Sequence, residues 1–159
     1  APFPGVWIAK PLFNGPNRRY DFMTASTLSA SQVQQYLADI FPQFDASIVH
    51  LDKEGAILEL ATDVRHLRPG GTVSGPTMMA LADAAMYVAI LGNIGKVALA
   101  VTTNLNINFY RKPAPGKLRA EARILKMGAR LAVGDVLLYS EGVDQSVAHV
   151  TITYSIPTQ

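Results

Sequence analysis

The sequence contains no cysteine, no large charge excess and no long uninterrupted apolar run. Without cysteine the chain forms no disulfide, no thiolate metal site and no cysteine nucleophile, and this suits a reducing compartment such as the cytoplasm. The 14 lysine and arginine residues against 12 aspartate and glutamate residues give a net charge of only +2, which makes nucleic acid a poor expectation as a partner. The longest apolar run, Met78 to Leu91, is interrupted by Asp83 and is shorter than the roughly 20 residues of a membrane-spanning helix.

The length and composition indicate one globular domain. The chain has 159 residues, of which 49% are hydrophobic, and a chain of this size can bury a core. Residues 1–28 mix proline, glycine and charge without a period, so we expect a poorly ordered or peripheral arm there. We expect residues 29–159 to form the domain, beginning with a short helix that Ser29 caps and Pro42 ends.

Alternating apolar and polar residues predict an antiparallel sheet with one dry face. In residues 101–110, for example, Val101, Leu105 and Ile107 fall on one face and Thr102 on the other. The strands predicted in this way cover residues 47–52, 56–62, 101–110, 118–124, 131–141 and 148–156.

The segment from Pro76 to Leu91 predicts the helix that covers this dry face. It is apolar on every side except at Thr77 and Asp83, so we expect it to be buried all round. Ser74 or Gly75 can cap it, Pro76 suits its first position, and Gly92 and Gly95 are expected to end it. The result is an α+β domain in which a curved antiparallel sheet wraps one long central helix.

Asp83 is the strongest candidate for chemistry. It follows Pro76 by seven residues, which is too deep in the helix for a cap, and aspartate has a poor helix propensity. Two interpretations stay open. The carboxylate either satisfies a buried polar partner or a subunit contact, or it acts as a general base or a nucleophile.

The start of the same helix is the second candidate, because free N–H groups there can stabilise a developing oxyanion. Pro76 has no N–H, so Gly75 would have to donate; an ordinary loop and cap is the alternative. A serine triad is a poor expectation because Ser74 has no neighbouring histidine motif.

The histidines are weaker candidates. His50 and His149 fall on predicted strands, where a structural role is expected, whereas His66 lies in the loop that leads to the helix. No two histidines have zinc-ligand spacing, and we expect neither a metal nor another cofactor.

Residues 68–83 and 101–116 resemble the phenylacetate-degradation (PaaI-like) branch of the hot-dog acyl-CoA thioesterases. In that family Asn-x-x-Gly-x-x-His-Gly-Gly opens the central helix, and a catalytic acid follows in a Leu-Ala-Asp-like stretch. The corresponding residues here run from Arg68-Pro-Gly-Gly-Thr-Val to Ser74-Gly75-Pro76, and Asp83 follows in Leu-Ala-Asp-Ala-Ala. Arg68, Ser74 and Pro76 replace the family's Asn, His and second Gly.

The resemblance implies a hot-dog fold and hydrolysis of an acyl-CoA to a free acid and CoA. It gives Asp83 the place of the catalytic acid and the Gly75 N–H the role of polarising the thioester carbonyl, with the Ser74 hydroxyl where the family has an imidazole. The expected substrate contacts, some of them to the CoA phosphates, are Arg68, His66, Pro76, Thr77, Thr102, Arg111, Lys112 and Arg130.

The resemblance also implies a homodimer with a shared sheet, paired into a homotetramer with its sites at subunit interfaces. A non-catalytic acyl-CoA-binding or sensor protein of the same fold is the alternative, because the family's Asn and His are replaced. A hot-dog hydratase is a weaker one, because no histidine lies between Pro69 and Asp83.

Overall fold

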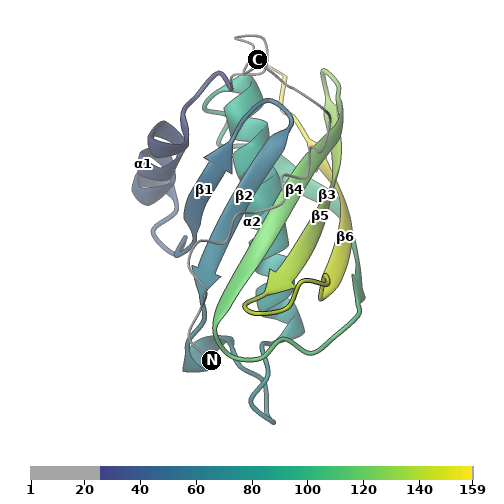
Figure 1. The fold of residues 1–159 in the computed structure, drawn as a ribbon. Helices are drawn as coiled ribbons and strands as arrows, with labels where there is room; N and C mark the ends of the chain where they lie inside the picture. The colour runs from purple at the N-terminus through teal and green to yellow at the C-terminus, as the bar shows by residue number, and fades with distance from the viewer. Residues whose placement is uncertain (1–25, 159) are drawn as a thin grey trace, which may run out of the picture.

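The computed structural model describes residues 26–158 and shows a six-stranded antiparallel sheet curved around one long helix (Figure 1). This confirms the α+β hot-dog architecture; residues 1–25 of the expected arm lie outside the described residues. The elements are α1 (Ala30–Ile40), β1 (Ser47–Leu51), β2 (Gly55–Ala61), the short 3-10 helix η1 (Val64–His66), α2 (Gly75–Ile94), β3 (Val101–Phe109), β4 (Lys117–Met127), β5 (Leu131–Ser140) and β6 (Ala148–Ser155).

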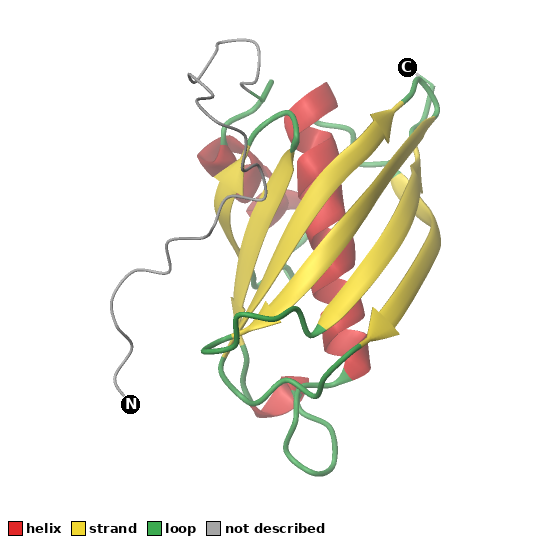
Figure 2. Cartoon of the chain, turned by 45° about the vertical axis from the view of Figure 1, so that its right-hand side comes forward, coloured by secondary structure: helices red, strands yellow, loops and turns green. Residues whose placement is uncertain are grey.

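The strands lie in the order β1-β2-β4-β5-β6-β3, so β1 and β3 form the two edges of the sheet. The helix α2 runs along the concave side (Figure 2), and α1 packs beside β1. Every neighbouring pair of strands is antiparallel. The edge strand β3 begins a few residues after α2 ends, which places its first residues near the helix.

The first helix begins as its sequence predicts. The Ser29 hydroxyl accepts a hydrogen bond from the Gln32 N–H at 3.2 Å, and the Gln32 side chain accepts one from the Ser29 N–H at 2.8 Å. This reciprocal capping box satisfies two N–H groups that a helix start otherwise leaves free. Val33 and Leu37, one turn apart, are then fully buried.

Ser74, not Gly75, caps α2: its hydroxyl accepts a hydrogen bond from the Thr77 N–H at 3.2 Å. The predicted end at Gly92 is wrong, because the helix continues to Ile94 and is capped by Gly95. Gly92 serves packing instead. A Cβ atom there would lie only 2.6 Å from Cδ1 of Leu51, so a glycine lets β1 approach the helix closely.

The helix α2 is not buried on every side, contrary to the expectation from its composition. Met79 is 39% exposed, and Asp83 and Tyr87 are only partly buried. These three residues are spaced by four, so they form one stripe along the helix. The sheet curves around the rest of α2, where an unbroken set of side chains from Val88 to Leu91 is fully buried.

By length and composition α2 could cross a membrane, but more than half of its most apolar stretch is buried as the core helix of this fold.

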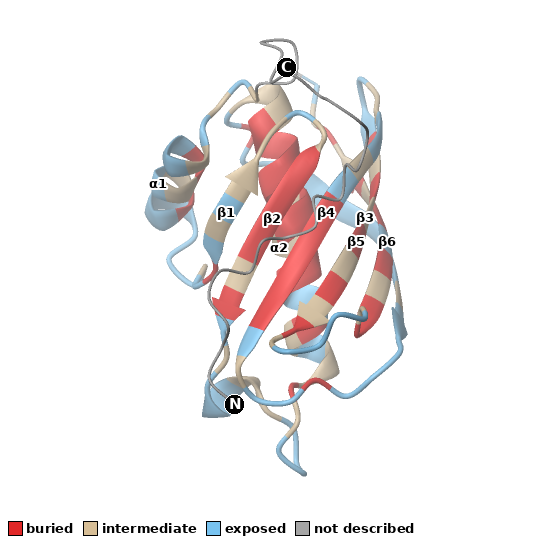
Figure 3. Ribbon diagram, in the orientation of Figure 1, coloured by how far each residue is buried: buried red, intermediate tan, exposed pale blue. Residues whose placement is uncertain are grey.

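The sequence predicts one dry face for the sheet, but part of the outer face of β4 is also buried. Arg119 and Glu121 alternate on β4 with core residues and so point away from α2, yet they are only 3% and 7% exposed. Among the strands, β2 and β4 have the longest runs of buried residues in Figure 3. Their charges are paired, with Arg119 Nε 3.0 Å from Glu121 Oε1. Burial raises the pKa of Glu121, and Arg119 opposes that rise. Charged side chains tolerate burial when they are paired in this way.

Candidate active site

A cavity of about 820 Å³ lies along one side of α2 and is bordered by Asp83 and Tyr87 of the exposed stripe. Apolar walls come from the end of α1 and the loop after it, from β2 and from α2 itself. At one end the cavity is bordered by Asp83, Thr102 and Tyr154; at the other it is bordered by the start of α2. We call this space the acid cavity.

Two hydroxyl groups converge on one oxygen of Asp83. Thr102 Oγ1 donates to Oδ1 at 2.5 Å, and the Tyr154 hydroxyl donates to the same Oδ1 at 2.7 Å. The Tyr154 hydroxyl also lies 3.0 Å from the Asp83 backbone carbonyl oxygen. Among residues 26–158, no donor reaches Oδ2, so this oxygen is free to meet a ligand or water.

Thr102 reaches Asp83 because β3 contains a β-bulge. Thr102 pairs with Tyr154 and Asn104 with Thr153, so the register slips by one residue at Thr103. The slip turns Thr102 to the same face as Leu105. The strict alternation predicted for residues 101–110 is therefore wrong at its start, and the bulge is the physical reason.

Tyr154 is a site residue that the sequence did not single out. It lies on β6, is only 3% exposed, and its ring stacks on that of Tyr87 with centroids 6.2 Å apart. Burial, and then the negative charge of Asp83, raise the pKa of Tyr154, so the phenol keeps its proton and donates. Its signal in the sequence was slight: a hydroxyl at a position where β6 otherwise presents aliphatic side chains to the core.

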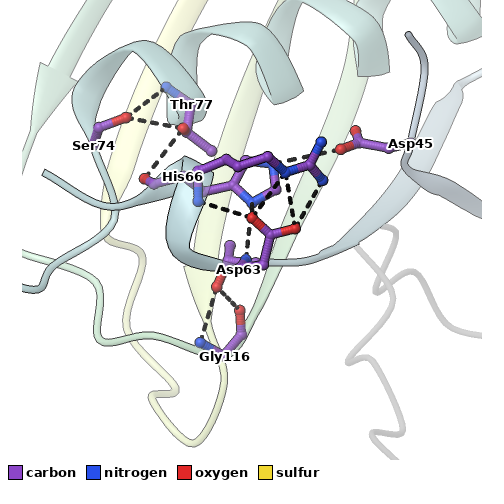
Figure 4. A network of polar contacts seen from close by, with 8 residues as sticks. Asp45, Asp63, His66, Ser74, Thr77 and Gly116 are labelled. Carbon is purple, nitrogen blue, oxygen red and sulfur yellow. Dashed lines mark hydrogen bonds and ion pairs between the residues drawn. The ribbon is translucent and has the colours of Figure 1, made fainter.

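At the other end of the acid cavity, polar groups tie the η1 turn to the start of α2 (Figure 4). The Ser74 N–H donates to the His66 carbonyl oxygen at 2.8 Å, and Thr77 Oγ1 donates to the same oxygen at 3.3 Å. The Ser74 and Thr77 hydroxyls lie 2.8 Å apart. The candidates His66, Ser74, Pro76 and Thr77 all line this cavity, as does Thr102 at the opposite end.

The His66 ring is held between two carboxylates. Its Nδ1 accepts a hydrogen bond from the Asp63 N–H at 2.9 Å, so in the neutral ring the proton lies on Nε2, 3.4 Å from Asp45 Oδ2. Arg65 binds Asp63 through Nε and Nη2, the latter at 2.7 Å, and these hydrogen bonds lower the pKa of Asp63 to about 2. Because both ring nitrogens of His66 have partners, its geometry supports a structural role in the cavity wall and not a role as a general base.

A second cavity of about 480 Å³ lies at the start of α2 and contains Gly75. Within residues 26–158 no group accepts the Gly75 N–H. A Cβ there would lie 3.2 Å from the Phe109 ring, so glycine permits close approach. The remaining walls include two aromatic and three cationic side chains: Phe109, Tyr110, Arg68, Arg111 and Lys112. We call this space the basic cavity.

The two candidate catalytic groups thus line different cavities of one chain. Asp83 borders the acid cavity and Gly75 the basic cavity. Ser74 precedes Gly75 but borders the acid cavity. Arg130 borders neither of these two cavities; its backbone oxygen accepts a hydrogen bond from the Ile156 N–H.

The two histidines expected to be structural have carboxylate partners outside the site. His50 Nε2 lies 2.8 Å from Asp52 Oδ2, and this hydrogen bond raises the pKa of His50. His149 Nε2 lies 3.1 Å from Asp135 Oδ2, which also faces Arg123. Among the described residues, no three histidine, aspartate or glutamate side chains are grouped so as to hold a metal ion.

Comparisons with known proteins identify the family of the chain. The sequence profile of the thioesterase superfamily matches residues 70–147. A crystal structure from Silicibacter sp. TM1040, described as a candidate thioesterase, is 48% identical, with a TM-score of 0.78 over 85% of this chain and 96% of that one. A candidate esterase of Saccharolobus solfataricus is 30% identical over 70% of this chain and 75% of its own.

A variant of the phenylacetic acid degradation protein PaaI from Thermus thermophilus is 25% identical, with a TM-score of 0.64 over 75% of this chain and 99% of that one. The matched profile covers the helix start, Asp83 and Thr102 together. The chain therefore belongs to the thioesterase superfamily, and thioester hydrolysis is the general activity that this membership supports.

Proposed function

We propose that this protein hydrolyses an acyl-CoA thioester to a free acid and CoA, with Asp83 as the reacting carboxylate. The observation that carries the proposal is the arrangement at Asp83. Its Oδ1 is held by two hydroxyls, no described group donates to Oδ2, and the residue borders a largely apolar cavity of about 820 Å³, which is large enough for an acyl group. The likeness to PaaI of Thermus thermophilus supports assignment to the PaaI-like branch.

Asp83 can promote hydrolysis in two ways, as a general base or as a nucleophile. As a general base it takes a proton from water while the water oxygen bonds to the acyl carbon; the C–S bond breaks and the sulfur leaves with the proton. As a nucleophile it bonds to the acyl carbon and expels the thiolate, which takes a proton from solvent; water then cleaves the anhydride and restores the carboxylate. In both routes the Gly75 N–H stabilises the negative charge on the carbonyl oxygen.

The site is assembled from two subunits. In one chain Asp83 and Gly75 line separate cavities, so a carbonyl held by Gly75 needs the carboxylate of another chain. The edge strand β3 offers a row of unpaired backbone groups for this contact, next to exposed Val101 and Phe109. We place a homodimer with a shared sheet here, paired into a tetramer. Light scattering from a 17.1 kDa particle at micromolar concentration would contradict it.

Subunit mixing tests the shared site directly. Asp83→Asn removes the acid, and Gly75→Val fills the basic cavity beside Phe109. Each variant alone should be inactive. Refolded together, they should form heterodimers in which one site has both groups intact, restoring about a quarter of the wild-type rate when the chains pair at random. No recovery in a mixture that is shown to contain heterodimers would place the whole site in one chain.

In this arrangement the acyl group enters the acid cavity and the CoA moiety crosses the basic cavity. Arg68, Arg111 and Lys112 would pair with its phosphates, and Phe109 or Tyr110 offers an aromatic face to the adenine. Arg130 borders neither cavity, so its contact with CoA stays a prediction. The lack of cysteine supports a cytoplasmic reaction.

Thiol release over a panel of acyl-CoA substrates tests the proposal, with Asp83→Asn as the matched variant. Release by the wild type and its loss in the variant support hydrolysis at Asp83. The replacement of the family's Asn and His by Arg68 and Ser74 favours the second candidate, a non-catalytic acyl-CoA-binding protein. Binding of acyl-CoA without any thiol release would establish that candidate instead.

A further inference from the structure

The hydroxyl of Tyr154 makes contacts that packing alone does not require. The ring is buried and stacked on Tyr87, so an unmodified phenyl ring would fill the same space. Its hydroxyl instead lies 2.7 Å from Asp83 Oδ1 and 3.0 Å from the carbonyl oxygen of the same residue. A phenol has one proton, and the shorter distance to the charged oxygen identifies the carboxylate as its main acceptor.

Two donors on the same oxygen fix the carboxylate in a way that one donor does not. Thr102 approaches Oδ1 from the edge strand β3, and Tyr154 approaches it from the neighbouring strand β6. With Oδ1 held from two strands, rotation about the Cβ–Cγ bond would break two charge-assisted hydrogen bonds. The position of Oδ2 is thereby determined as well.

We propose that Tyr154 is a positioning residue for the reaction: together with Thr102 it immobilises Oδ1 of Asp83 and so makes Oδ2 the oxygen that reacts. The inference rests on the proposed function, since it concerns the same carboxylate. It adds Tyr154 as a positioning residue and identifies Oδ2 as the reacting atom. Oδ2 accepts no hydrogen bond within residues 26–158, which leaves its lone pairs for a water proton or an acyl carbon.

Tyr154 is suited to this role because its hydroxyl keeps its proton and donates it to Asp83. Burial and the nearby Asp83 raise its pKa, so the hydroxyl does not ionise in the working range. The other ionisable side chains around the acid cavity are Tyr87, His66, Asp45 and Arg65. Of these, Tyr87 donates its hydroxyl to the Ala98 carbonyl oxygen, and within residues 26–158 it makes no hydrogen bond to the carboxylate.

The test compares pH profiles of kcat/KM for thiol release. Tyr154→Phe keeps the ring and removes one donor to the charged carboxylate, which favours its protonated form. We expect kcat to fall about tenfold, with KM nearly unchanged, and the acid limb of the profile to move to higher pH by about one unit. Thermal unfolding of the same sample separates this loss from a loss of folded protein.

Tyr87→Phe is the matched control. It removes a hydroxyl from the neighbouring stacked ring, whose partner is Ala98 and not Asp83. Whatever this change does to KM, the acid limb should stay at the wild-type pH. A shift of equal size in both variants would show that the ring pair acts on the site through packing.

A second variant keeps the test decisive if Tyr154→Phe folds poorly. Introducing 3-fluorotyrosine at position 154 by codon suppression keeps the hydroxyl and nearly the same shape but makes the phenol a stronger donor. The acid limb should then move to lower pH, opposite to its shift in Tyr154→Phe. A purely structural residue gives no such pair of opposite shifts.

The outcomes separate this inference from the proposed function. If Asp83→Asn abolishes turnover while both changes at Tyr154 leave kcat and the acid limb at wild-type values, the positioning role is wrong and the catalytic carboxylate stands. If Asp83→Asn is as active as the wild type, the proposed function fails first. Opposite shifts of the limb, with Asp83→Asn inactive, support both.

Discussion

Asp83 borders the acid cavity, whereas Asp63 is not among its lining residues and instead contacts Arg65 and His66, which are. The two carboxylates have different partners. Asp63 is 47% exposed and is bound by the Arg65 guanidinium, which holds its pKa at about 2. Asp83 receives hydrogen bonds from two neutral hydroxyls, and no cation pairs with it among the described residues. A guanidinium neutralises the carboxylate that it orients, whereas hydroxyls orient a carboxylate and leave its charge available.

The comparison explains why one acid stabilises the structure and the other is suited to chemistry. Asp63 also caps η1, with its Oδ1 accepting the Arg65 N–H at 2.8 Å, so its lone pairs are used in holding the turn. By contrast, no group in the described part of the chain donates a hydrogen bond to Asp83 Oδ2.

The largest difference should appear between Asp83→Asn and Asp63→Asn. Asp83→Asn keeps the size of the side chain but removes its basicity, so we expect turnover to fall by about 10²- to 10⁴-fold, with folding and ligand affinity nearly kept. Asp63→Asn removes an exposed ion pair and should leave turnover within about a few-fold of the wild type. Initial rates of thiol release, normalised to folded protein, give both values.

Three other results would contradict the different roles assigned to Asp63 and Asp83. Equal losses in both variants would mean that the two acids share one role. An Asp83→Asn protein whose residual activity follows a lowered melting temperature would make that residue structural. An Asp83→Asn protein as stable and as active as the wild type would remove it from the mechanism.

Thr102 gives the next largest expected effect. Thr102→Val keeps the shape but removes one of the two donors to Oδ1, and we expect a loss of about tenfold in kcat. Thr102→Ser restores the hydroxyl and should recover most of that loss. Failure of serine to recover more than valine would show that the Thr102 methyl group, and not the hydroxyl bond to Asp83, matters at this position.

The position of Asp83 was predictable from its own segment, whereas alternation placed Thr102 on the wrong face and did not single out Tyr154, for a physical reason. A carboxylate seven residues into an apolar helix conflicts with local propensity, and such a conflict is visible in one segment. Thr102 faces Asp83 only because β3 bulges at Thr103, which no period of two can reveal. Tyr154 comes from a strand 71 residues further along the chain, and its role exists only after the sheet has formed.

The secondary structure was likewise predictable where it depends on local sequence pattern and not where it depends on tertiary contacts. Alternation and capping predicted every strand and both α-helices, because each of these depends on local pattern. Gly92 was wrongly taken as a helix end because its reason, the close approach of Leu51, is a tertiary contact. The separation of Gly75 from Asp83 into two cavities likewise depends on how β3 and the helix start lie in space.

Basic side chains should have a smaller effect than either hydroxyl. Arg111→Ala and Lys112→Ala remove cations from the basic cavity, and each should weaken acyl-CoA binding by about a few-fold, with less dependence on salt than in the wild type. Arg130→Ala is the control, because Arg130 borders neither cavity. Isothermal titration at low and high salt measures both effects. Equal weakening by Arg130→Ala would extend the CoA contact to the β4–β5 turn.

The smallest predicted effect concerns the stabilising pair, Arg65 and Asp63. The pKa of Asp63 is about 2 in the folded protein against an ordinary value of 3.8. A carboxyl group with a lowered pKa stabilises the fold above its ordinary value, and that stabilisation is lost as the pH falls through 3.8 towards 2.

Arg65→Gln removes the cause of this shift. The melting temperature of the variant should therefore lie slightly below that of the wild type at pH 5 and above, and the gap should close as the pH falls towards 2. The gap should be small and should shrink in high salt, because the pair is exposed and screened. Thermal unfolding followed by circular dichroism between pH 5 and pH 2 measures it. A gap that persists at the lowest pH would mean that Arg65 stabilises the fold through contacts other than Asp63, and the contrast between a neutralised and an available carboxylate would then rest on Asp83 alone.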